Sequence, residues 1–264
     1  MYHLPPYLWA MTIAGIIAFP AVTCIVLYGG AKRAGLGRRA ATGLTAGAAV
    51  VLGGWLAASA VIAGHGWYHT RLGHSVPWMP VAVVGFLATL LALSRIPVVA
   101  RVLDAPGMVS KLLYPHSFRV DGVVFLLAMA LGHLPALFAL PAGLGDIAAG
   151  LAAPLVARRL ARGTGRRSAL WFNAWGITDL VTALVLGALV GYQLVRVTPA
   201  GSLISELPLV LIPTAAVPLL FVLHLTSVRA LIRGRRPAAA PQAGGARPRT
   251  ALADGPASRA ASAP

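Results

Sequence analysis

The sequence predicts an all-α membrane protein, a seven-transmembrane helical bundle with its N-terminus outside and its C-terminus in the cytoplasm. Three observations predict this fold class. The 264-residue chain is 58% hydrophobic and only 11% charged, and its mean hydropathy of +0.79 is too high for an ordinary soluble domain. Seven apolar runs approach or exceed the roughly 20 residues that a helix needs to cross a bilayer core of about 30 Å. The basic residues gather between alternate runs.

Each apolar run begins and ends at charged or turn-forming residues, which set the limits of the predicted spans. The fifth run is the shortest and follows the fourth across a Pro-Ala-Gly corner at 141–143. A re-entrant hairpin over 120–157 is the alternative, and we reject it because the fourth run alone is long enough to cross. The predicted transmembrane domain covers 1–234, with spans at about 8–28, 42–63, 77–94, 120–140, 142–157, 169–195 and 207–228.

The distribution of Arg and Lys predicts the orientation. Four segments on one side of the spans hold 20 of the 22 basic residues, and only Arg71 and Arg196 fall on the other side. The positive-inside rule assigns the basic side to the cytoplasm, which predicts a multi-pass protein of the bacterial inner membrane. No basic residue precedes the first span, so we expect that span to be retained and not cleaved as a signal peptide. The basic segments are 29–41, 95–119, 158–168 and the tail from 229.

Composition also limits the partners. A formal net charge of +16 on a soluble protein would suggest a nucleic-acid partner. Here the charge lies beside the predicted lipid headgroups, so we expect the lipid bilayer as partner and no nucleic acid. Residues 235–264 are dominated by Ala, Pro, Gly, Ser and Arg, which predicts a disordered basic tail. The single cysteine, Cys24, lies in the first span and excludes an intramolecular disulfide and a Cys-based metal site.

Three acidic residues fall in the predicted spans, where a carboxylate at the bilayer centre costs about 2.5 to 3.5 kcal/mol. Asp121 opens the fourth span, and we interpret it as a cap of the helix N-terminus. Asp146 and Asp179 share their helix faces with small residues, so both faces are expected to meet other helices. Two interpretations stay open for this pair: packing devices that hydrogen-bond a neighbouring helix, or carboxylates of a polar pathway that exchange protons or bind a cation.

Further polar residues could extend such a pathway. His133 and Asp146 are predicted in the outer half of the membrane, Asp179 near the middle, and Asn173 and His224 toward the cytoplasm. Unrelated local hydrogen bonds are the alternative. A bis-histidine haem is not expected, because His133 and His224 lie at different depths. No P-loop, dinucleotide fingerprint, GxSxG, HExxH or CxxC motif occurs, and we expect no cofactor.

A histidine-rich outer loop is a weak candidate for a metal site. His65 and His69 would share a helix face, and His74 follows them. Glycines on both sides of His65 argue against a helix there, and neither an acidic nor a Cys ligand accompanies the histidines. We therefore predict no metal site in this loop.

Prolines recur through the last span and its start, at positions 208, 213 and 218. Pro213 and Pro218 each remove a backbone hydrogen bond and free carbonyl groups around Leu209 and Thr214, which predicts a kinked helix. Lipid tolerates such a helix only where neighbours or water bind the freed groups. A hinge, a cavity wall or close packing would each explain it.

Three stretches carry a resemblance to a known family. They read LPALFALPAGLGD at 134–146, WFNAWGITDL at 171–180 and LIPTAAVPL at 211–219. Together they resemble a family of uncharacterised bacterial multi-pass integral membrane proteins, over about 120–230. The resemblance implies no activity, ligand or fold. It does place Asp146, Asn173, Asp179 and His224 within or just after these stretches, and leaves the histidine-rich loop outside them.

Three functions compete. Small-solute or proton-linked transport is the first, because ionisable groups lie on small-residue faces beside a proline-kinked span. A non-catalytic membrane subunit or scaffold is the second, and its partner would be another membrane protein or a second copy of the chain. A membrane-embedded lipid-modifying enzyme is the least favoured, because neither a nucleophile nor a metal cluster is predicted where a lipid headgroup would lie. The ligand is not indicated by any motif.

Overall fold

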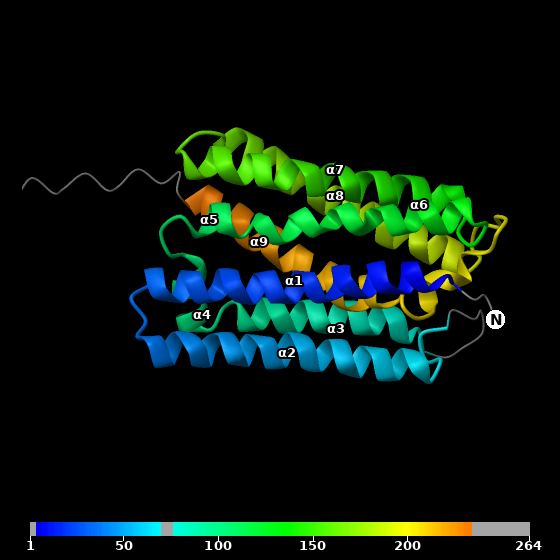
Figure 1. The fold of residues 1–264 in the computed structure, drawn as a ribbon, viewed down its shortest axis with the longest axis horizontal. Coiled ribbons are helices and arrows are strands. Elements are labelled where there is room, and N and C mark those ends of the chain that lie inside the picture. Colours follow the sequence, from blue (N-terminus) through cyan, green and yellow to red (C-terminus); the bar gives the residue numbers. More distant parts are fainter. Residues whose placement is uncertain (1–3, 70–75, 234–264) are drawn as a thin grey trace, which may run out of the picture.

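The protein is an all-helical bundle over the residues that its computed structural model describes, 4–69 and 76–233 (Figure 1). The first helices, α1 to α4, are followed by one segment built from α5, the 3₁₀-helix η1 and α6. Two long helices, a short 3₁₀ turn (η2), a π-helical turn (η3) and α9 complete the bundle. The bounds are α1 Pro6–Arg33, α2 Arg38–Gly64, α3 Trp78–Leu93, α4 Pro97–Leu103, α5 Met108–Lys111, η1 Tyr114–Gly122, α6 Val123–Ala130, α7 Ala136–Ala161, α8 Arg166–Gly191, η2 Gly201–Ser205, η3 Ile212–Ala216 and α9 Val217–Arg233.

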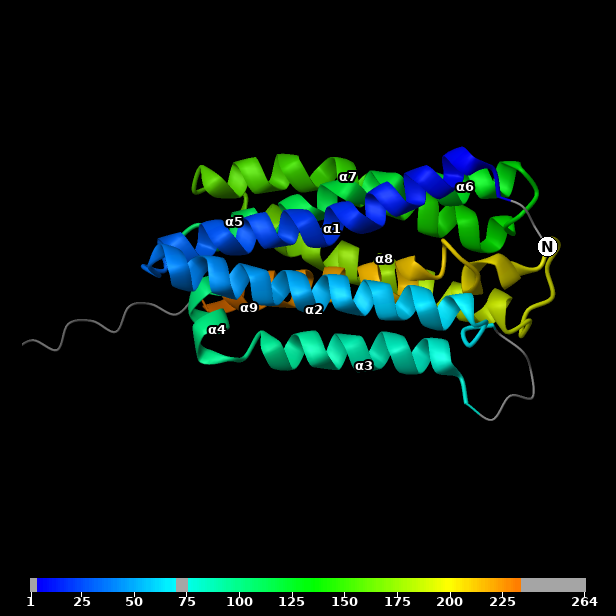
Figure 2. The same cartoon turned by 60° about the horizontal axis from the view of Figure 1, so that its bottom comes forward.

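Six helical segments in the described part of the chain are long and apolar enough to cross a membrane. They are α1, α2, the segment Met108–Ala130, α7, α8 and the segment Ile212–Arg233. The prediction of a helical membrane fold is therefore confirmed. The α3 helix is shorter, and α4 follows it at an angle of 87° (Figure 2). The pair counts as a seventh candidate span only if the bent helices are taken together.

The corner between the fourth and fifth predicted spans lies elsewhere than expected. The α6 helix ends at Ala130 and α7 begins at Ala136, so Pro141 lies inside a continuous α7. Gly132 adopts a left-handed conformation at φ 75° and Pro135 precedes the first residue of α7, which together turn the chain here. The short fifth span predicted at 142–157 is thus part of a full-length helix.

The fourth segment also begins earlier than predicted. Its charged residues marked 95–119 as a loop, whereas the helical segment starts at Met108. Arg119 therefore lies inside the bundle and not at its surface. Asp121 lies within η1 and makes no cap hydrogen bond, so its interpretation as a helix cap is wrong.

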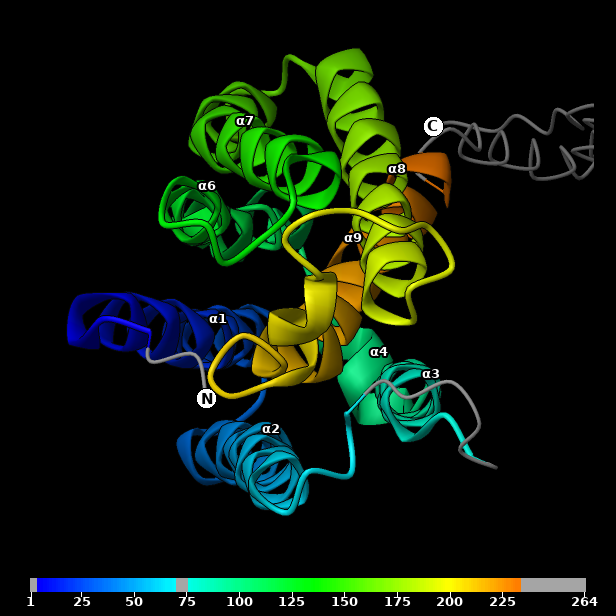
Figure 3. The same ribbon diagram turned by 90° about the vertical axis from the view of Figure 1, so that its right-hand side faces the viewer.

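Close approach between α7 and η1 depends on glycine. A Cβ atom at Gly150 would lie 2.5 Å from the backbone nitrogen of Val120, and one at Gly122 would lie 2.5 Å from Cβ of Asp146. The two backbones consequently pack against each other with no side chain between them. The end-on view shows α9 surrounded by the other long helices and α2 at the rim (Figure 3).

A backbone carbonyl that is freed at the irregular start of the last span accepts a hydrogen bond from α2. Pro218 has no N–H to donate to the carbonyl of Thr214, and the indole Nε1–H of Trp55 donates to that carbonyl instead, at 2.8 Å. Ser59 of α2 is 2.8 Å from the Thr214 hydroxyl, Oγ to Oγ1. The freed carbonyl predicted at Thr214 is confirmed, and its partner comes from a helix far away in sequence.

Replacing Trp55 with Phe tests this contact. In the wild-type protein the Trp55 ring stacks on Phe86 with centroids 4.8 Å apart. A phenylalanine at position 55 keeps this stacking but leaves the Thr214 carbonyl without its hydrogen bond. We expect a loss of about 1 to 3 kcal/mol of unfolding free energy, measured as thermal unfolding in detergent by circular dichroism. Trp175→Phe, at a position 56% exposed, is the control and should be nearly neutral. Equal effects of the two changes would contradict the role of Trp55.

Glycine 150 offers a second test of the packing. In Gly150→Ala the added methyl group meets backbone of η1, which cannot move aside, so we expect a destabilisation of about 1 to 3 kcal/mol. The matched control is Gly53→Ala in α2, where nothing lies within 4 Å of the new atom. That control should be neutral or stabilising by up to about 1 kcal/mol, because alanine is the better helix former. The same unfolding assay compares both variants.

Candidate functional site: a buried arginine between two aspartates

A fully buried arginine lies at the middle of the bundle. Arg119 is 1% exposed and belongs to η1, a 3₁₀ stretch of nine residues, whereas such stretches rarely exceed about four. A buried guanidinium without partners is strongly destabilising, and more so in a membrane. Partner groups from other helices must therefore hold Arg119 in place.

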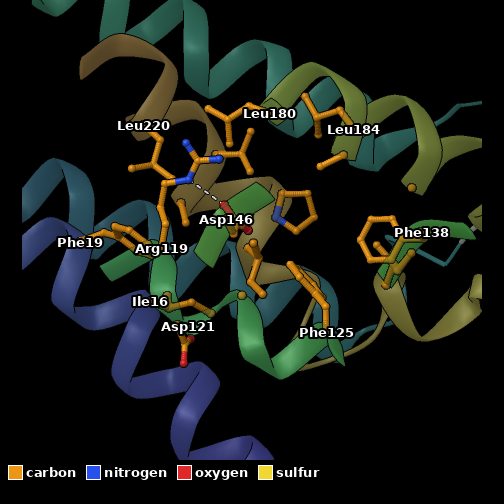
Figure 4. Close-up of a pocket in the computed structure, with 18 of the residues that line it drawn as sticks. Ile16, Phe19, Arg119, Asp121, Phe125, Phe138, Asp146, Leu180, Leu184 and Leu220 are labelled. Atoms are coloured by element: carbon orange, nitrogen blue, oxygen red, sulfur yellow. Dashed lines mark hydrogen bonds and ion pairs between the residues drawn. The ribbon is translucent and has the colours of Figure 1, made fainter. Parts of the chain in front are cut away.

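Two carboxylates and one imidazole surround the Arg119 guanidinium. Its Nε donates to Oδ1 of Asp146 in α7 at 2.6 Å, and a second nitrogen, Nη2, donates to Asp179 in α8. Figure 4 shows the first of these contacts as a dashed line. The remaining nitrogen, Nη1, lies 3.5 Å from Nε2 of His224 in α9. One side chain thus joins three helices.

An asparagine fixes the orientation of His224. The amide nitrogen of Asn173 donates to the carbonyl of Ala169 at 2.7 Å, so its carbonyl oxygen faces Nδ1 of His224 at 2.9 Å. That oxygen can only accept, so Nδ1 carries the proton. In the neutral ring Nε2 then presents a lone pair to Arg119, whose guanidinium can only donate. The three hydrogen bonds therefore form one chain in which each contact has a single donor. Arg119 donates to His224, His224 to Asn173, and Asn173 to the carbonyl of Ala169.

Small residues allow these groups to meet. A Cβ atom at Gly176 of α8 would overlap the His224 ring, and one at Gly145 of α7 would overlap the Asp179 carboxylate. Small residues were expected on the face of Asp179, and at Gly176 this face meets His224 of α9. Both glycines leave the space that the ionic side chains fill.

The cluster lies near the middle of four of the candidate spans. Arg119, Asp146, Asp179 and His224 each lie within about one turn, roughly 3.6 residues, of the middle residue of their own segment. One guanidinium faces two carboxylates, so one negative charge lacks a counter-charge when both carboxylates are ionised. A single proton or monovalent cation would balance the cluster.

A small cavity of about 70 Å³ adjoins the cluster. It is larger than the roughly 30 Å³ that one water molecule occupies in the liquid. Its polar lining comes from Arg119, Asp121 and Asp146, and its walls are otherwise apolar, with Phe125 and Phe138 on one side (Figure 4). Asp121 points away from Arg119 toward α1, where its carboxylate packs on Gly15 (Figure 4). The cavity can hold water or a small polar group against the carboxylates.

Comparison with known families identifies most of the chain. A family model described as a domain of unknown function, DUF8737, matches residues 76–232. The chain belongs to this family. No curated protein and no solved structure is detectably similar to the chain. The match agrees with the expectation of a family without an assigned activity, and it begins earlier in the chain than the predicted range of 120–230.

The DUF8737 segment runs from just before α3 to the end of α9 and contains every member of the cluster. Four of the residues predicted from the sequence meet there: Asp146, Asn173, Asp179 and His224. His133 does not, because it lies half-buried in the turn between α6 and α7 and not within a span.

The histidine-rich loop lies outside the DUF8737 segment. His65 follows the last residue of α2, and the His69 ring packs near Gly66. His74 lies outside the described residues. Within 4–69 and 76–233, no group of three or more His, Cys, Asp or Glu could hold a metal ion.

Two buried residues were not predicted from the sequence: Arg119 of the cluster, and His116, whose ring stacks on His224. Both were assigned to the basic loop 95–119 because charged and polar residues interrupt the apolar pattern there. The apolar pair Leu112–Leu113, which is fully buried, was the signal that the helical segment starts earlier. A predicted span that began before Leu112 would have included both Arg119 and His116.

Replacing Arg119 with Met tests the ionic cluster. Methionine fills a similar volume but leaves Asp146 and Asp179 without a cation, so we expect a loss of about 3 to 5 kcal/mol of unfolding free energy. The control is Arg233→Met, which breaks a pair with Asp104 at 3.1 Å between half-exposed side chains. That change should cost less than about 1 kcal/mol.

Combining Arg119→Met with Asp146→Asn and Asp179→Asn should restore part of the lost stability, because the uncompensated charges are then removed. If Arg119→Met alone were as mild as Arg233→Met in detergent unfolding, the cluster could not be the organising contact.

Proposed function

We propose that this protein carries protons, or a small solute coupled to protons, across the inner membrane of a bacterium. The observation that supports the proposal is one guanidinium shared by two carboxylates near the middle of the candidate spans. A purely structural ion pair needs one carboxylate, whereas two on one arginine leave a negative charge that a proton can neutralise.

We propose seven crossings, with the N-terminus outside and the C-terminus in the cytoplasm. In this arrangement α3 is the third crossing and α4 lies along the cytoplasmic surface, which fits their 87° bend. With Arg119 placed in the bundle, the proposed cytoplasmic side holds 19 of the 22 basic residues. The α1–α2 and α7–α8 connections and the end of α9 lie at one end of the bundle, in agreement with this assignment (Figure 1).

The proposed mechanism is an exchange of partners at Arg119. A proton that binds Asp146 removes its negative charge and weakens its bond to the guanidinium, so Arg119 is then held mainly by Asp179. Loss of the proton restores the shared state. Because the two aspartates belong to α7 and α8, the exchange changes how tightly these helices are joined.

Two irregular elements can accommodate such a change. The 3₁₀ segment η1 carries Arg119 itself, and the π-helical turn η3 precedes α9 beside the cavity. Irregular helical turns of these kinds often mark functional hinges. They support a moving site more than they support a rigid scaffold.

The two alternative functions make different demands. A scaffold needs every buried charge matched, and the cluster instead holds one carboxylate too many. A lipid-modifying enzyme needs its reactive groups near the headgroups, whereas this cluster lies at mid-depth. Transport is therefore the function we infer.

Proton flux into liposomes tests the proposal. Purified protein is reconstituted with a pH-sensitive dye inside, and a potassium gradient with valinomycin supplies the driving force. We expect Asp146→Asn and Asp179→Asn each to lower the flux at least tenfold, since the amide cannot exchange the proton. Asp104→Asn, at an exposed aspartate, is the matched control and should keep the wild-type rate. Unchanged flux in both variants, with both proteins folded, would rule the proposal out.

A further inference from the structure

A second buried histidine lies next to the cluster and has no role in holding it. His116 is fully buried in η1, one 3₁₀ turn before Arg119. Its ring stacks on His224 with centroids 3.9 Å apart and planes tilted by 31°. Phe172 of α8 meets the His116 ring edge-on at 5.6 Å. The ring is thus held between α8 and α9.

Neither nitrogen of His116 has a hydrogen-bond partner among the described residues. A neutral imidazole always carries one N–H donor and one lone pair. Each such group left unpaired in a protein interior costs about 1 to 3 kcal/mol. Native structures keep groups of this kind where internal water or a ligand binds them.

Two hydroxyl groups on the same two segments also lack a partner among the described residues. The hydroxyl of Ser227 is fully buried and has no hydrogen-bond partner within 4–69 and 76–233, and it follows His224 by three residues on the same face of α9. The hydroxyl of Ser117, next to His116 in the chain, is likewise without a partner in the described part of the molecule. Ser227 follows His224 toward the end of α9, and Ser117 precedes Arg119 in η1. The end of α9 lies at the arginine-rich end of the bundle (Figure 1).

The two histidines differ in whether their ring nitrogens have hydrogen-bond partners among the described residues. Both nitrogens of His224 are occupied, by Asn173 and by Arg119, so its ring cannot take a proton without breaking the chain that orients it. Both nitrogens of His116 are available. The charged or titratable groups that face it are His224 of α9 and Arg119 of its own segment, while α8 presents Phe172. From α7, Asp146 is bonded to Arg119.

We propose that His116 and Ser227 bind internal water, and that His116 relays protons between this water and the Arg119 cluster from the arginine-rich end. The relay rests on the proposed function, whereas the water site does not. In the relay, a hydrated proton binds the lone-pair nitrogen of His116. The other nitrogen then releases its proton through water to an ionised carboxylate of the cluster. A ring flip or exchange with water returns the imidazole to its first tautomer.

The water site is tested by solid-state NMR of ¹⁵N-histidine-labelled protein in lipid vesicles. The spectrum of His116→Phe assigns the His116 signals by difference. We expect magnetisation transfer from water to a His116 nitrogen, and Ser227→Ala should weaken that transfer at least twofold. Absence of water transfer to His116 in the wild-type protein would overturn the water site.

The relay is tested by combining flux with stability in His116→Phe. Phenylalanine removes two buried nitrogens that have no protein partner among the described residues, so the unfolding temperature should stay unchanged or rise. Flux should fall at least tenfold. A merely structural histidine would give the opposite pattern, with lower stability and unchanged flux. His65→Phe, at an exposed position at the other end of the bundle, is the matched control for flux.

The two proposals fail in distinguishable ways. If Asp179→Asn abolishes flux but His116→Phe retains it, the relay is wrong and the transport function stands. If the wild-type protein carries no proton flux while His116 still shows water transfer, the transport function and the relay are wrong and the water site stands. Ser227→Ala keeps the His116 ring and should lower flux severalfold, which covers the case that His116→Phe fails to fold.

Discussion

The buried guanidinium of Arg119 is the constraint on which the rest of the bundle depends. A permanent charge buried near the middle of a candidate span is stable only where acceptors surround it, and these come from α7, α8 and α9. Their convergence requires close backbones, which explains why glycines of α7 and α8 face the ionic side chains. The close packing of η1, α7, α8 and α9 around the site is thus tied to one interaction.

Backbone hydrogen bonding imposes a second constraint around the same site. The 3₁₀ segment η1 and the π-helical turn η3 both depart from the regular α-helix within candidate spans. Lipid cannot bind the polar groups that such turns release, so both must be enclosed by protein. The indole of Trp55 provides this for Thr214. The peripheral α2 helix therefore supports the central one through a polar contact as well as an apolar one.

The two histidines show how structure and function differ in their demands. His224 is bonded at both nitrogens and belongs to a fully satisfied chain, which serves rigidity. His116 stacks on it with no bonds of its own in the described part of the chain. A fold selected for stability alone would place an apolar ring at position 116. The cost of keeping an imidazole there is most simply explained by a task that requires it.

The sequence by itself determined the helical membrane fold, because apolar runs of this length have no other stable solvent. It also placed Asp146 and Asp179 on faces that meet other helices, since small residues recur there at helical spacing. It placed Asn173 and His224 nearer the cytoplasm than Asp146 and Asp179, and it did not predict the hydrogen bond between Asn173 and His224. Arg119 and His116 were assigned to a loop, because the pattern treats charge as a sign of water. Only the tertiary structure decided otherwise: their partners lie up to 108 residues away in sequence, and a local pattern carries no information about such distant neighbours. His133 differs, because the local pair Gly132 and Pro135 turns the chain beside it, and the apolar pattern did not separate this turn from a span.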